Sequence, residues 1–374
     1  MDKHLHIVCL DVPYPVNHGG HFDLFHKLSP LHKAGVKISL HCFENENSGS
    51  PELNKFCEQV FYYPREKGRT GFSLKLPYIV ASRRNEMLTK RLLEDDHPIL
   101  LEGVHCSSLL QDERFAGRKI ALRLHNVESI YYRQLYRAAP AGIKKWYYLY
   151  ESIMLRKYEL FLAAKTPVIL AVSRKDEQVY REKFGARQIA YLPVFTGFSE
   201  VLAKEGIGCF CLYHGNLSVP ENEKMAIWLL EKVFNDIPIP FLVAGRNPSS
   251  RLARIIGKNP NASLMANPSD EDMRDMISKA QMNLAPSFNA TGVKLKLLNA
   301  LFNGRHCIVN DAAVEGTGFE PACHIAGNAE GFKSIIAQLY NRPFSEEEIM
   351  LRKKLLAGIF DNEKNAARLI QWIW

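Results

Sequence analysis

The sequence predicts an α/β protein built from two doubly wound parallel sheets, and three observations support this fold class. The chain has 374 residues, which is too long for one ordinary core and suits two domains of typical size. Short apolar runs alternate with helical patterns along the chain, as they do in parallel α/β proteins. The segment YLPVFTGF, residues 191–198, contains proline and glycine and separates two such series, so we expect a linker there.

The first series contains six short apolar runs with helical patterns between them. Strands are predicted over residues 4–10, 36–43, 59–63, 98–103, 119–124 and 167–173. Helices are predicted over residues 20–34, 85–95, 143–165 and 174–184.

The second series repeats this alternation. Its strands are predicted over residues 207–215, 239–245, 262–266, 282–287, 306–311 and 323–327, and its helices over 221–235, 248–257, 270–280, 293–302 and 329–341. Each series is long enough for one doubly wound sheet. We therefore expect domains over 1–195 and 196–355, and a terminal helix over 356–374 whose apolar end packs back on the first domain.

Composition points to a globular protein inside the cell. Hydrophobic residues make up 47% of the chain and charged residues 24%, which is ordinary for folded domains. No apolar run reaches the roughly 18 residues that span a bilayer. The N-terminal MDKHLHIVCLDVPYP lacks the small-residue cleavage site of a signal peptide and is typical of a first buried strand. We expect a cytoplasmic protein.

The eight cysteines mostly lie in apolar, strand-like runs such as HIVCL and GCFCLY. They form no C-x-x-C pair and no cysteine–histidine cluster at zinc spacing. The sequence therefore predicts reduced thiols in the core, and we expect no metal.

Basic residues gather with aromatic ones in two stretches of the first domain. Residues 61–91 hold eight basic residues against two acidic ones, and residues 133–165 combine lysines and arginines with tryptophan and tyrosines. Such a surface suits an anionic membrane face or a phosphorylated lipid. It would also suit nucleic acid, although no nucleic-acid module signature is present, and a solvated helix face over ordinary core remains an alternative.

In open α/β sheets, ligands bind beyond the carboxyl ends of the strands, and the first domain has two such positions. Gly19 and Gly20 open the first helix, where backbone N–H groups can approach a phosphate. His105 and His125 each follow a buried strand, and Glu128 lies near the second one as an acid/base candidate. Capping residues and satisfied polar contacts are the structural alternative for each histidine.

Three loops of the second domain offer a similar site. Gly215 and Asn216 end its first strand, and Arg246 follows its second, where a guanidinium could contact a diphosphate. The most informative loop is APSFNATGVKLKLLNALFNG. There we expect Gly292 to end a small-residue turn and a helix to start with Val293 and Lys294 in its first turn.

A cation at a helix start is disfavoured by the helix dipole. Lys294 makes sense at that position if an anion binds there as well. Asn299 lies further along the same helix, within reach of a ligand that crosses the helix start.

Five segments in order resemble the group-1 glycosyltransferases of glycosyltransferase family 4. They are PYPVNHGGHFD, LRLHNVES, VILAVSRKDEQVY, YHGNLSVPEN and GVKLKLLNALFNGRHCIVND. The resemblance covers nearly the whole chain. It implies the GT-B fold, in which two Rossmann-like doubly wound domains face a central cleft.

The resemblance also implies a reaction. A nucleoside diphosphate sugar would lie against the C-terminal domain, and a glycan or lipid-linked acceptor would approach from the N-terminal one, past the catalytic candidates His105, His125 and Glu128. No cofactor or metal would be needed, and the anomeric configuration would be retained. The donor-binding candidates are Gly19, Gly20, Gly215, Asn216, Arg246, Gly292, Val293, Lys294 and Asn299.

The sequence departs from the family pattern at three positions. The family often carries two glutamates eight positions apart where this chain has Thr291 and Asn299, and an arginine where it has Asn216. The predicted function is that of a hexosyltransferase in cell-surface polysaccharide synthesis. Because of these departures, two alternatives stay open. One is a nucleotide-sugar epimerase of the same fold, and the other is a non-catalytic nucleotide-sugar-binding protein. A dinucleotide-dependent oxidoreductase is disfavoured because no strand is followed by G-x-G-x-x-G.

Overall fold

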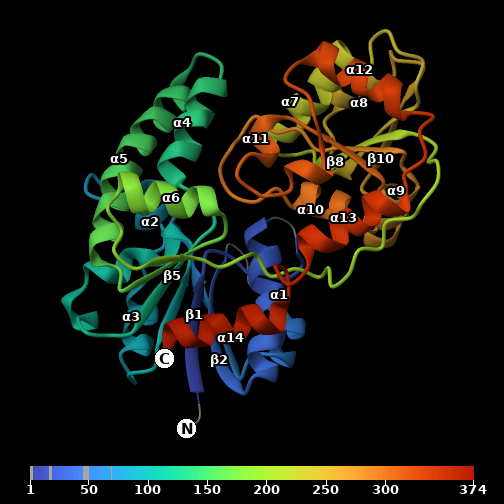
Figure 1. Cartoon of the computed structure of the whole chain (residues 1–374). Helices are drawn as coiled ribbons and strands as arrows, with labels where there is room; N and C mark the ends of the chain where they lie inside the picture. Colours follow the sequence, from blue (N-terminus) through green and yellow to red (C-terminus); the bar gives the residue numbers. More distant parts are fainter. Residues whose placement is uncertain (1–2, 17–18, 45–49, 69) are drawn as a thin grey trace. The chain divides into compact units, whose positions relative to one another are not determined.

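The computed structural model describes residues 3–16, 19–44, 50–68 and 70–374, which form two compact units (Figure 1). Unit 1 comprises Met1–Gly197, Thr291–Val293 and Gly358–Trp374, and unit 2 comprises Phe198–Ala290 and Lys294–Ala357. Each unit is an α/β domain with one parallel sheet. The predicted fold class is confirmed.

Unit 1 contains a seven-stranded parallel sheet in the order β3-β2-β1-β4-β5-β6-β7. The strands are β1 (Lys3–Cys9), β2 (Val36–Glu44), β3 (Gln59–Pro64), β4 (Ile99–Glu102), β5 (Ile120–Leu124), β6 (Val168–Ala171) and β7 (Ile189–Tyr191). The helices are α1 (Gly19–Lys33), α2 (Tyr78–Ala81), α3 (Glu86–Leu92), α4 (Glu128–Ala138), α5 (Ile143–Lys165), α6 (Arg174–Lys183) and α14 (Asn362–Ile373). Short 3-10 turns add η1 (Pro51–Lys55), η2 (Val104–Gln111) and η3 (Glu113–Phe115).

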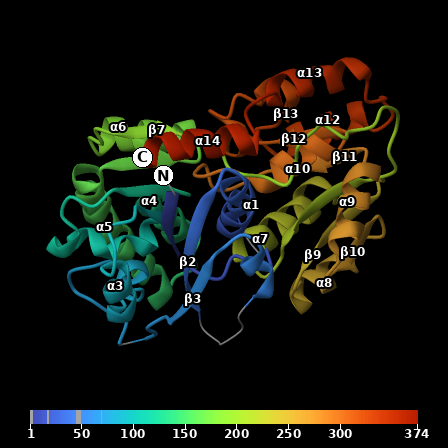
Figure 2. The same ribbon diagram turned by 90° about the horizontal axis from the view of Figure 1, so that it is seen from below.

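Both faces of the unit 1 sheet are covered, which explains the continuous apolar runs of its central strands. On one face, Leu24, Leu28 and Leu31 of α1 pack with Leu369 and Ile373 of α14. Figures 1 and 2 show α14 beside α1. The apolar end of the chain is thus buried within unit 1, although Trp372 and Trp374 stay partly exposed.

Unit 2 contains a six-stranded parallel sheet in the order β10-β9-β8-β11-β12-β13. The strands are β8 (Cys211–Asn216), β9 (Phe241–Arg246), β10 (Ala262–Ala266), β11 (Met282–Leu284), β12 (His306–Val309) and β13 (His324–Ile325). The helices are α7 (Pro220–Trp228) with a π-helical continuation η4 (Leu229–Val233), α8 (Ser250–Ile256), α9 (Asp270–Lys279), α10 (Leu295–Asn303), α11 (Asp311–Val314), η5 (Glu320–Ala322), α12 (Ala329–Leu339) and α13 (Glu346–Leu356).

Several elements differ from the prediction, and three of them bear on the sites described below. The helix α4 and the short strand β7 were not expected, and β7 extends the unit 1 sheet into the segment predicted as linker. The helix predicted over 293–302 begins at Leu295, so Lys294 is its N-cap residue and does not lie in the first turn. Gly292 precedes it with a φ of +65°, a left-handed conformation that delays the helix start.

All eight cysteines are free thiols, and six of them are buried, as a reduced core requires. Cys209 is exposed and Cys323 is partly so. A search of the described residues finds no helix with the length and apolar character needed to cross a bilayer.

Candidate active site

The carboxyl edge of the unit 1 sheet brings His125 and Glu102 together. Glu102 ends β4, and His125 follows the neighbouring strand β5. His125 Nε2 lies 3.1 Å from Glu102 Oε2. Because an ionised carboxylate only accepts hydrogen bonds, Nε2 carries the hydrogen of this bond, and in the neutral imidazole Nδ1 carries the lone pair. The His125 side chain is 14% exposed, so this oriented imidazole reaches the surface of unit 1.

Glu102 is itself held by a buried chain of alternating charges. Lys27 Nζ donates to Glu102 Oε1 at 2.5 Å and to Asp23 Oδ2 at 3.1 Å. Arg123 then donates two hydrogen bonds to Asp23, of 3.0 and 3.1 Å. Lys27, Asp23, Glu102 and Arg123 are all at most 2% exposed.

This arrangement keeps both carboxylates ionised. Burial opposes the ionisation of Glu102, but the charge of Lys27 and the bond to His125 hold its pKa below the ordinary value. Burial likewise opposes the ionisation of Asp23, but Arg123 and Lys27 lower its pKa well below the usual range. Ligand-type atoms of Asp23, Glu102 and His125 lie within 4.8 Å of one another. Two buried cations already neutralise these carboxylates, so a metal ion is not required there.

His105 lies in η2, directly after β4 and Gly103. Gly103 has a φ of +92°, and a Cβ placed there would lie 3.3 Å from His105 Nδ1 and 3.7 Å from His125 Cδ2. Gly103 therefore lets both imidazoles approach the end of β4. The structure brings the two predicted histidines to one corner of unit 1.

Glu128 is the first residue of α4 and is buried. Burial, with the neighbouring Glu159 charge adding to it, raises the pKa of Glu128 to about 8. Burial also raises the pKa of Glu159 to about 7. At neutral pH the Glu128 carboxyl group is therefore mostly protonated, which suits a hydrogen-bond donor better than a general base.

We expect this raised pKa to make unit 1 less stable as pH rises. The ordinary glutamate value is 4.5, so between pH 4.5 and about 8 the folded chain binds more protons than the unfolded chain. The stabilisation is complete below pH 4.5 and is lost as pH rises through 8. Glu128→Gln should flatten this dependence in denaturant titrations at pH 5, 6, 7 and 8. Exposed Glu182→Gln is the control, and equal pH slopes for Glu128→Gln and the unmodified protein would contradict the assignment.

The other predicted positions of unit 1 are backbone positions. Gly19 and Gly20 begin α1, as the sequence predicted. Thr291–Val293 is grouped with unit 1, and there the Gly292 N–H donates to Asp176 Oδ2 at 3.1 Å. A Cβ at Gly292 would come within 2.4 Å of Asn126 Oδ1. Gly292 is thus required for close packing, and its amide is already bonded to a carboxylate.

In unit 2, glycines at the carboxyl ends of β8 and β9 face each other. Gly215 pairs with Gly245, and a Cβ at Gly245 would lie 1.8 Å from the Gly215 carbonyl oxygen. Asn216 Oδ1 accepts from Ser218 N at 3.1 Å and from Ser218 Oγ at 2.7 Å, so its side chain closes the turn before α7. Arg246 is 41% exposed in its side chain and lies 3.6 Å from Asp270.

The start of α10 places a second lysine beside Lys294. Lys296 lies in the first turn, and its Nζ is 3.3 Å from Tyr213 Oη and 4.8 Å from the centre of that ring. Burial, and secondarily the charge of Lys294, lowers the pKa of Lys296 to about 8. Within the part of the chain that the structure describes, Lys296 forms no ion pair. One turn further, Asn299 Oδ1 accepts from Asn303 Nδ2 at 2.8 Å.

The C-terminal half matches a known family in sequence. Residues 209–342 match the sequence model of the family described as "Glycosyl transferases group 1". A 44.6 kDa protein of the cps region of Klebsiella pneumoniae is 28% identical over 331 residues, which cover 83% of this chain and 84% of that protein. In sequence, its C-terminal half is similar to group-1 glycosyltransferases.

Solved structures agree in fold. Sucrose-phosphate synthase from Thermosynechococcus elongatus has a TM-score of 0.73 at 14% identity, covering 99% of this chain and 98% of that chain. TarM of S. aureus, solved with UDP, has a TM-score of 0.66 at 10% identity and covers 99% of both chains. HepE of Anabaena, solved with UDP and glucose, has a TM-score of 0.62 at 10% identity, covering 99% and 98%. The chain thus has the GT-B fold.

Sequence reasoning missed four charged residues of these candidate sites. They are Asp23, Lys27, Arg123 and Lys296. The spacing of Asp23 and Lys27, four residues apart in the helix that follows the glycine pair, was an available signal. Lys296 lies two residues after Lys294 in the sequence. Only its contact with Tyr213, which is seen in the structure, distinguishes it from Lys294 as the buried lysine.

Proposed function

We propose that this chain is a glycosyltransferase that moves a hexose from a nucleoside diphosphate sugar to a glycan or lipid-linked acceptor in the synthesis of a cell-surface polysaccharide. The relative from a cps region supports the pathway class. The structural neighbours solved with UDP support a nucleoside diphosphate as the donor's leaving group.

The observation that carries the donor proposal is the environment of Lys296. Its ammonium group lies in the first turn of α10, against Tyr213 and without an ion pair among the described residues. A helix start also offers unpaired backbone N–H groups and positive dipole potential. A diphosphate bound there would supply the negative charge that Lys296 lacks as a partner. It would accept hydrogen bonds from the Lys296 ammonium group and from the backbone N–H groups of the helix start. Lys294 and Arg246 would add further positive charge.

The acceptor side of the proposal uses the oriented imidazole of unit 1. With Nε2 bonded to Glu102, His125 Nδ1 is the atom that would contact the acceptor hydroxyl or the transferred sugar. His105 lies at the same corner, and protonated Glu128 acts through packing and hydrogen bonding. Charge on the leaving diphosphate would be stabilised by lysines and helix amides without a metal ion. Retention of the anomeric configuration is part of the proposal.

A thermal-shift panel of UDP, GDP, ADP and CMP tests the donor site. We expect one nucleoside diphosphate to raise the melting temperature selectively, because a ligand that binds only the folded state stabilises it by mass action. Lys296→Ala should abolish most of this shift, and Lys294→Ala should reduce it. Lys279→Ala, an exposed lysine of α9 in the same unit, should leave it intact. A flat response to all four nucleotides would overturn the proposal.

The lowered pKa of Lys296 gives a second measurement on the same site. Below pH 8 the ammonium form attracts the diphosphate, and above pH 8 the neutral amine does not. Nucleotide affinity should therefore fall between pH 7 and 9 in the unmodified protein and stay more constant in Lys296→Arg.

Turnover of the sugar nucleotide without acceptor, faster than slow hydrolysis, would favour the epimerase instead.

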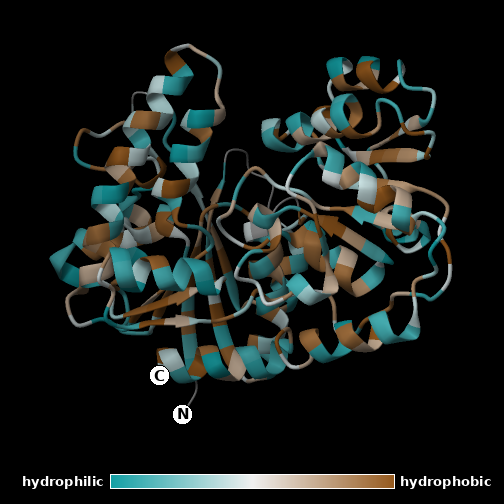
Figure 3. Cartoon of the chain, turned by 45° about the horizontal axis from the view of Figure 1, so that its top comes forward, coloured by the Kyte–Doolittle hydropathy of each residue, from teal (hydrophilic) through white to brown (hydrophobic). Residues whose placement is uncertain are grey.

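We also propose that unit 1 contacts an anionic membrane at the cytoplasmic side. The helices α4 and α5 form a hairpin that mixes hydrophobic and hydrophilic residues along its length (Figure 3). Near its tip, Ile143 is 91% exposed and Trp146 is 65% exposed. Lys144 and Lys145 lie between them in the sequence, and Lys145 Nζ lies 5.2 Å from the centre of the Tyr136 ring. Exposed apolar residues with flanking basic ones are typical of interfacial membrane contact.

Vesicle sedimentation tests this contact. The protein should bind vesicles with 30% phosphatidylserine more than neutral phosphatidylcholine vesicles, and more weakly as salt rises. The pair Ile143→Ser and Trp146→Ser should reduce binding about tenfold or more, because two large apolar side chains leave the interface. Met350→Ser, an exposed apolar residue of unit 2, is the control. Equal binding to both vesicle types would contradict the proposal.

A further inference from the structure

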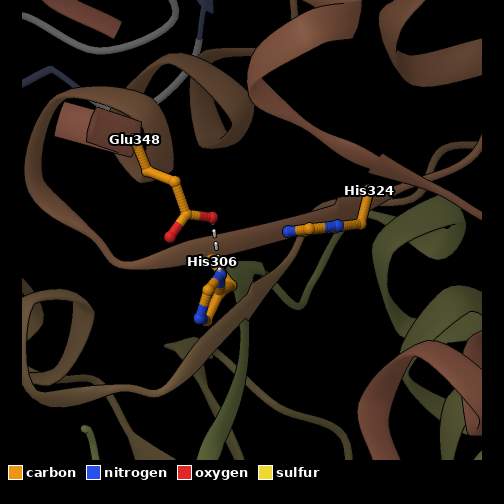
Figure 4. Close-up of side chains that lie close together, drawn as sticks. All are labelled: His306, His324 and Glu348. Carbon is orange, nitrogen blue, oxygen red and sulfur yellow. Dashed lines mark ion pairs between the residues drawn. The ribbon is translucent and has the colours of Figure 1, made fainter. Parts of the chain in front are cut away.

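Three potential metal ligands from distant parts of the sequence meet in unit 2 (Figure 4). His306 begins β12, His324 begins β13 and Glu348 lies in the first turn of α13. One ligand atom of each lies within 4.8 Å of the others. This cluster takes no part in the donor site described above.

The hydrogen bonds of His306 fix which nitrogen is available. Nε2 lies 3.1 Å from the Arg342 carbonyl oxygen, which can only accept, so Nε2 carries the hydrogen. In the neutral imidazole, Nδ1 then presents a lone pair toward Glu348 Oε1 at 3.4 Å. The His306 side chain is fully buried, and Nδ1 makes no hydrogen bond of acceptable geometry among the described residues.

With a neutral imidazole, this pair of facing acceptors can hold a cation between them. Ligands at 2.0–2.2 Å from a tetrahedral ion lie about 3.4 Å apart, which matches the separation of His306 Nδ1 and Glu348 Oε1. Metal-binding histidines usually donate their other ring N–H to a carbonyl or carboxylate, as His306 does.

Glu348 is also held in place. Its Oε2 accepts from Ser345 N at 3.0 Å in a capping box at the start of α13. Its Oε1 accepts from Arg342 at 3.0 Å, and the Arg342 side chain is 51% exposed. An ion beside Oε1 would displace this guanidinium into solvent, where it has room to move.

We propose that His306, His324 and Glu348 bind one divalent transition-metal ion, best matched by Zn²⁺, as a structural site that ties β12, β13 and α13 together. Two imidazoles and a carboxylate are a donor set that zinc accepts, with a water molecule in the fourth position. The ion would stabilise unit 2 and would take no part in sugar transfer. The proposal does not depend on the donor site.

Calorimetric titration of the chelator-treated protein with Zn²⁺ tests this site. We expect one ion per chain, a rise in melting temperature with Zn²⁺, and the visible absorption of tetrahedral Co²⁺ when Co²⁺ replaces it. His324→Ala and Glu348→Gln should each weaken Zn²⁺ binding at least about tenfold. Both avoid the buried His306, and glutamine can keep the capping box, so both variants should fold, as circular dichroism would verify.

Two further variants make the test specific. His97→Ala removes a partly exposed histidine of unit 1 and should leave Zn²⁺ binding unchanged. Arg342→Ala removes a competing cation and should bind Zn²⁺ as tightly as the unmodified protein or more tightly. The proposal is overturned if no ion binds at a ratio of one per chain. It is also overturned if His324→Ala and Glu348→Gln bind normally, which would leave only an adventitious surface ion, or if Arg342→Ala abolishes binding.

Discussion

Replacing His125 by alanine is expected to lower kcat by about two to four orders of magnitude, with a smaller change in KM. A positioned acid or base contributes roughly 10²- to 10⁴-fold to rate, and His125 is the partly exposed imidazole that Glu102 orients at the corner of unit 1. The measurement is the rate of sugar transfer with the nucleotide selected in the thermal-shift panel. His97→Ala is the matched control and should keep full activity.

The variant Glu102→Gln tests how much the orientation of His125 by Glu102 contributes, separately from the His125 imidazole itself. An amide can still accept from His125 Nε2 but brings no charge, so kcat should fall less than in His125→Ala. If His125→Ala transfers sugar at the normal rate, the assignment of this corner as the catalytic one fails.

Replacing Arg123 by methionine is expected to destabilise unit 1 by about 3–5 kcal/mol, because breaking a buried ion pair leaves the partner charge uncompensated. Arg123 is fully buried, and besides Asp23 it bonds the carbonyl oxygens of Leu192 and Pro193 at 2.6 and 2.8 Å. Asp23 Oδ1 also accepts from Phe195 N at 2.8 Å. The variant should therefore loosen the chain after β7 as well as the charge network.

Urea titration followed by fluorescence measures this loss. Arg114→Met, which removes an exposed ion pair with Asp112, should leave the unfolding midpoint unchanged. If Arg123→Met does not accumulate in folded form, the double variant with Asp23→Leu should recover part of the stability, since it removes the stranded carboxylate. A midpoint equal to that of the unmodified protein would contradict the role assigned to Arg123.

The fold could be predicted in detail because its signals are local. Apolar runs bounded by turns identified the strands, and the long helix predicted over 143–165 has those bounds in α5. The sequence did not predict α4, whose residues ESIYYRQLYRA mix polar and aromatic side chains and bury little apart from Glu128 and Ser129. Such a helix depends on packing against α5, and packing partners are not visible in a local window.

The candidate sites were predicted only in part, for a related reason. His105 and His125 follow strands, so their common edge could be inferred from topology. Their supporting charges come from α1 and β5, and only tertiary structure joins Asp23 to Arg123. The proposed zinc site depends on tertiary structure even more strongly. His306, His324 and Glu348 show no recognisable spacing, so the prediction that no metal binds could rest only on local motifs.

The assignment of Gly358–Trp374 to unit 1 has a consequence for synthesis on the ribosome. The side of α1 that packs against α14 stays uncovered until α14 emerges, and unit 2 is translated in between. At roughly 5–20 residues per second, this delay lasts on the order of ten seconds or more. During that interval the nascent chain exposes leucines of α1 to chaperones, whereas unit 2 can complete its core first. Expression of residues 1–197 alone would make that exposed state permanent.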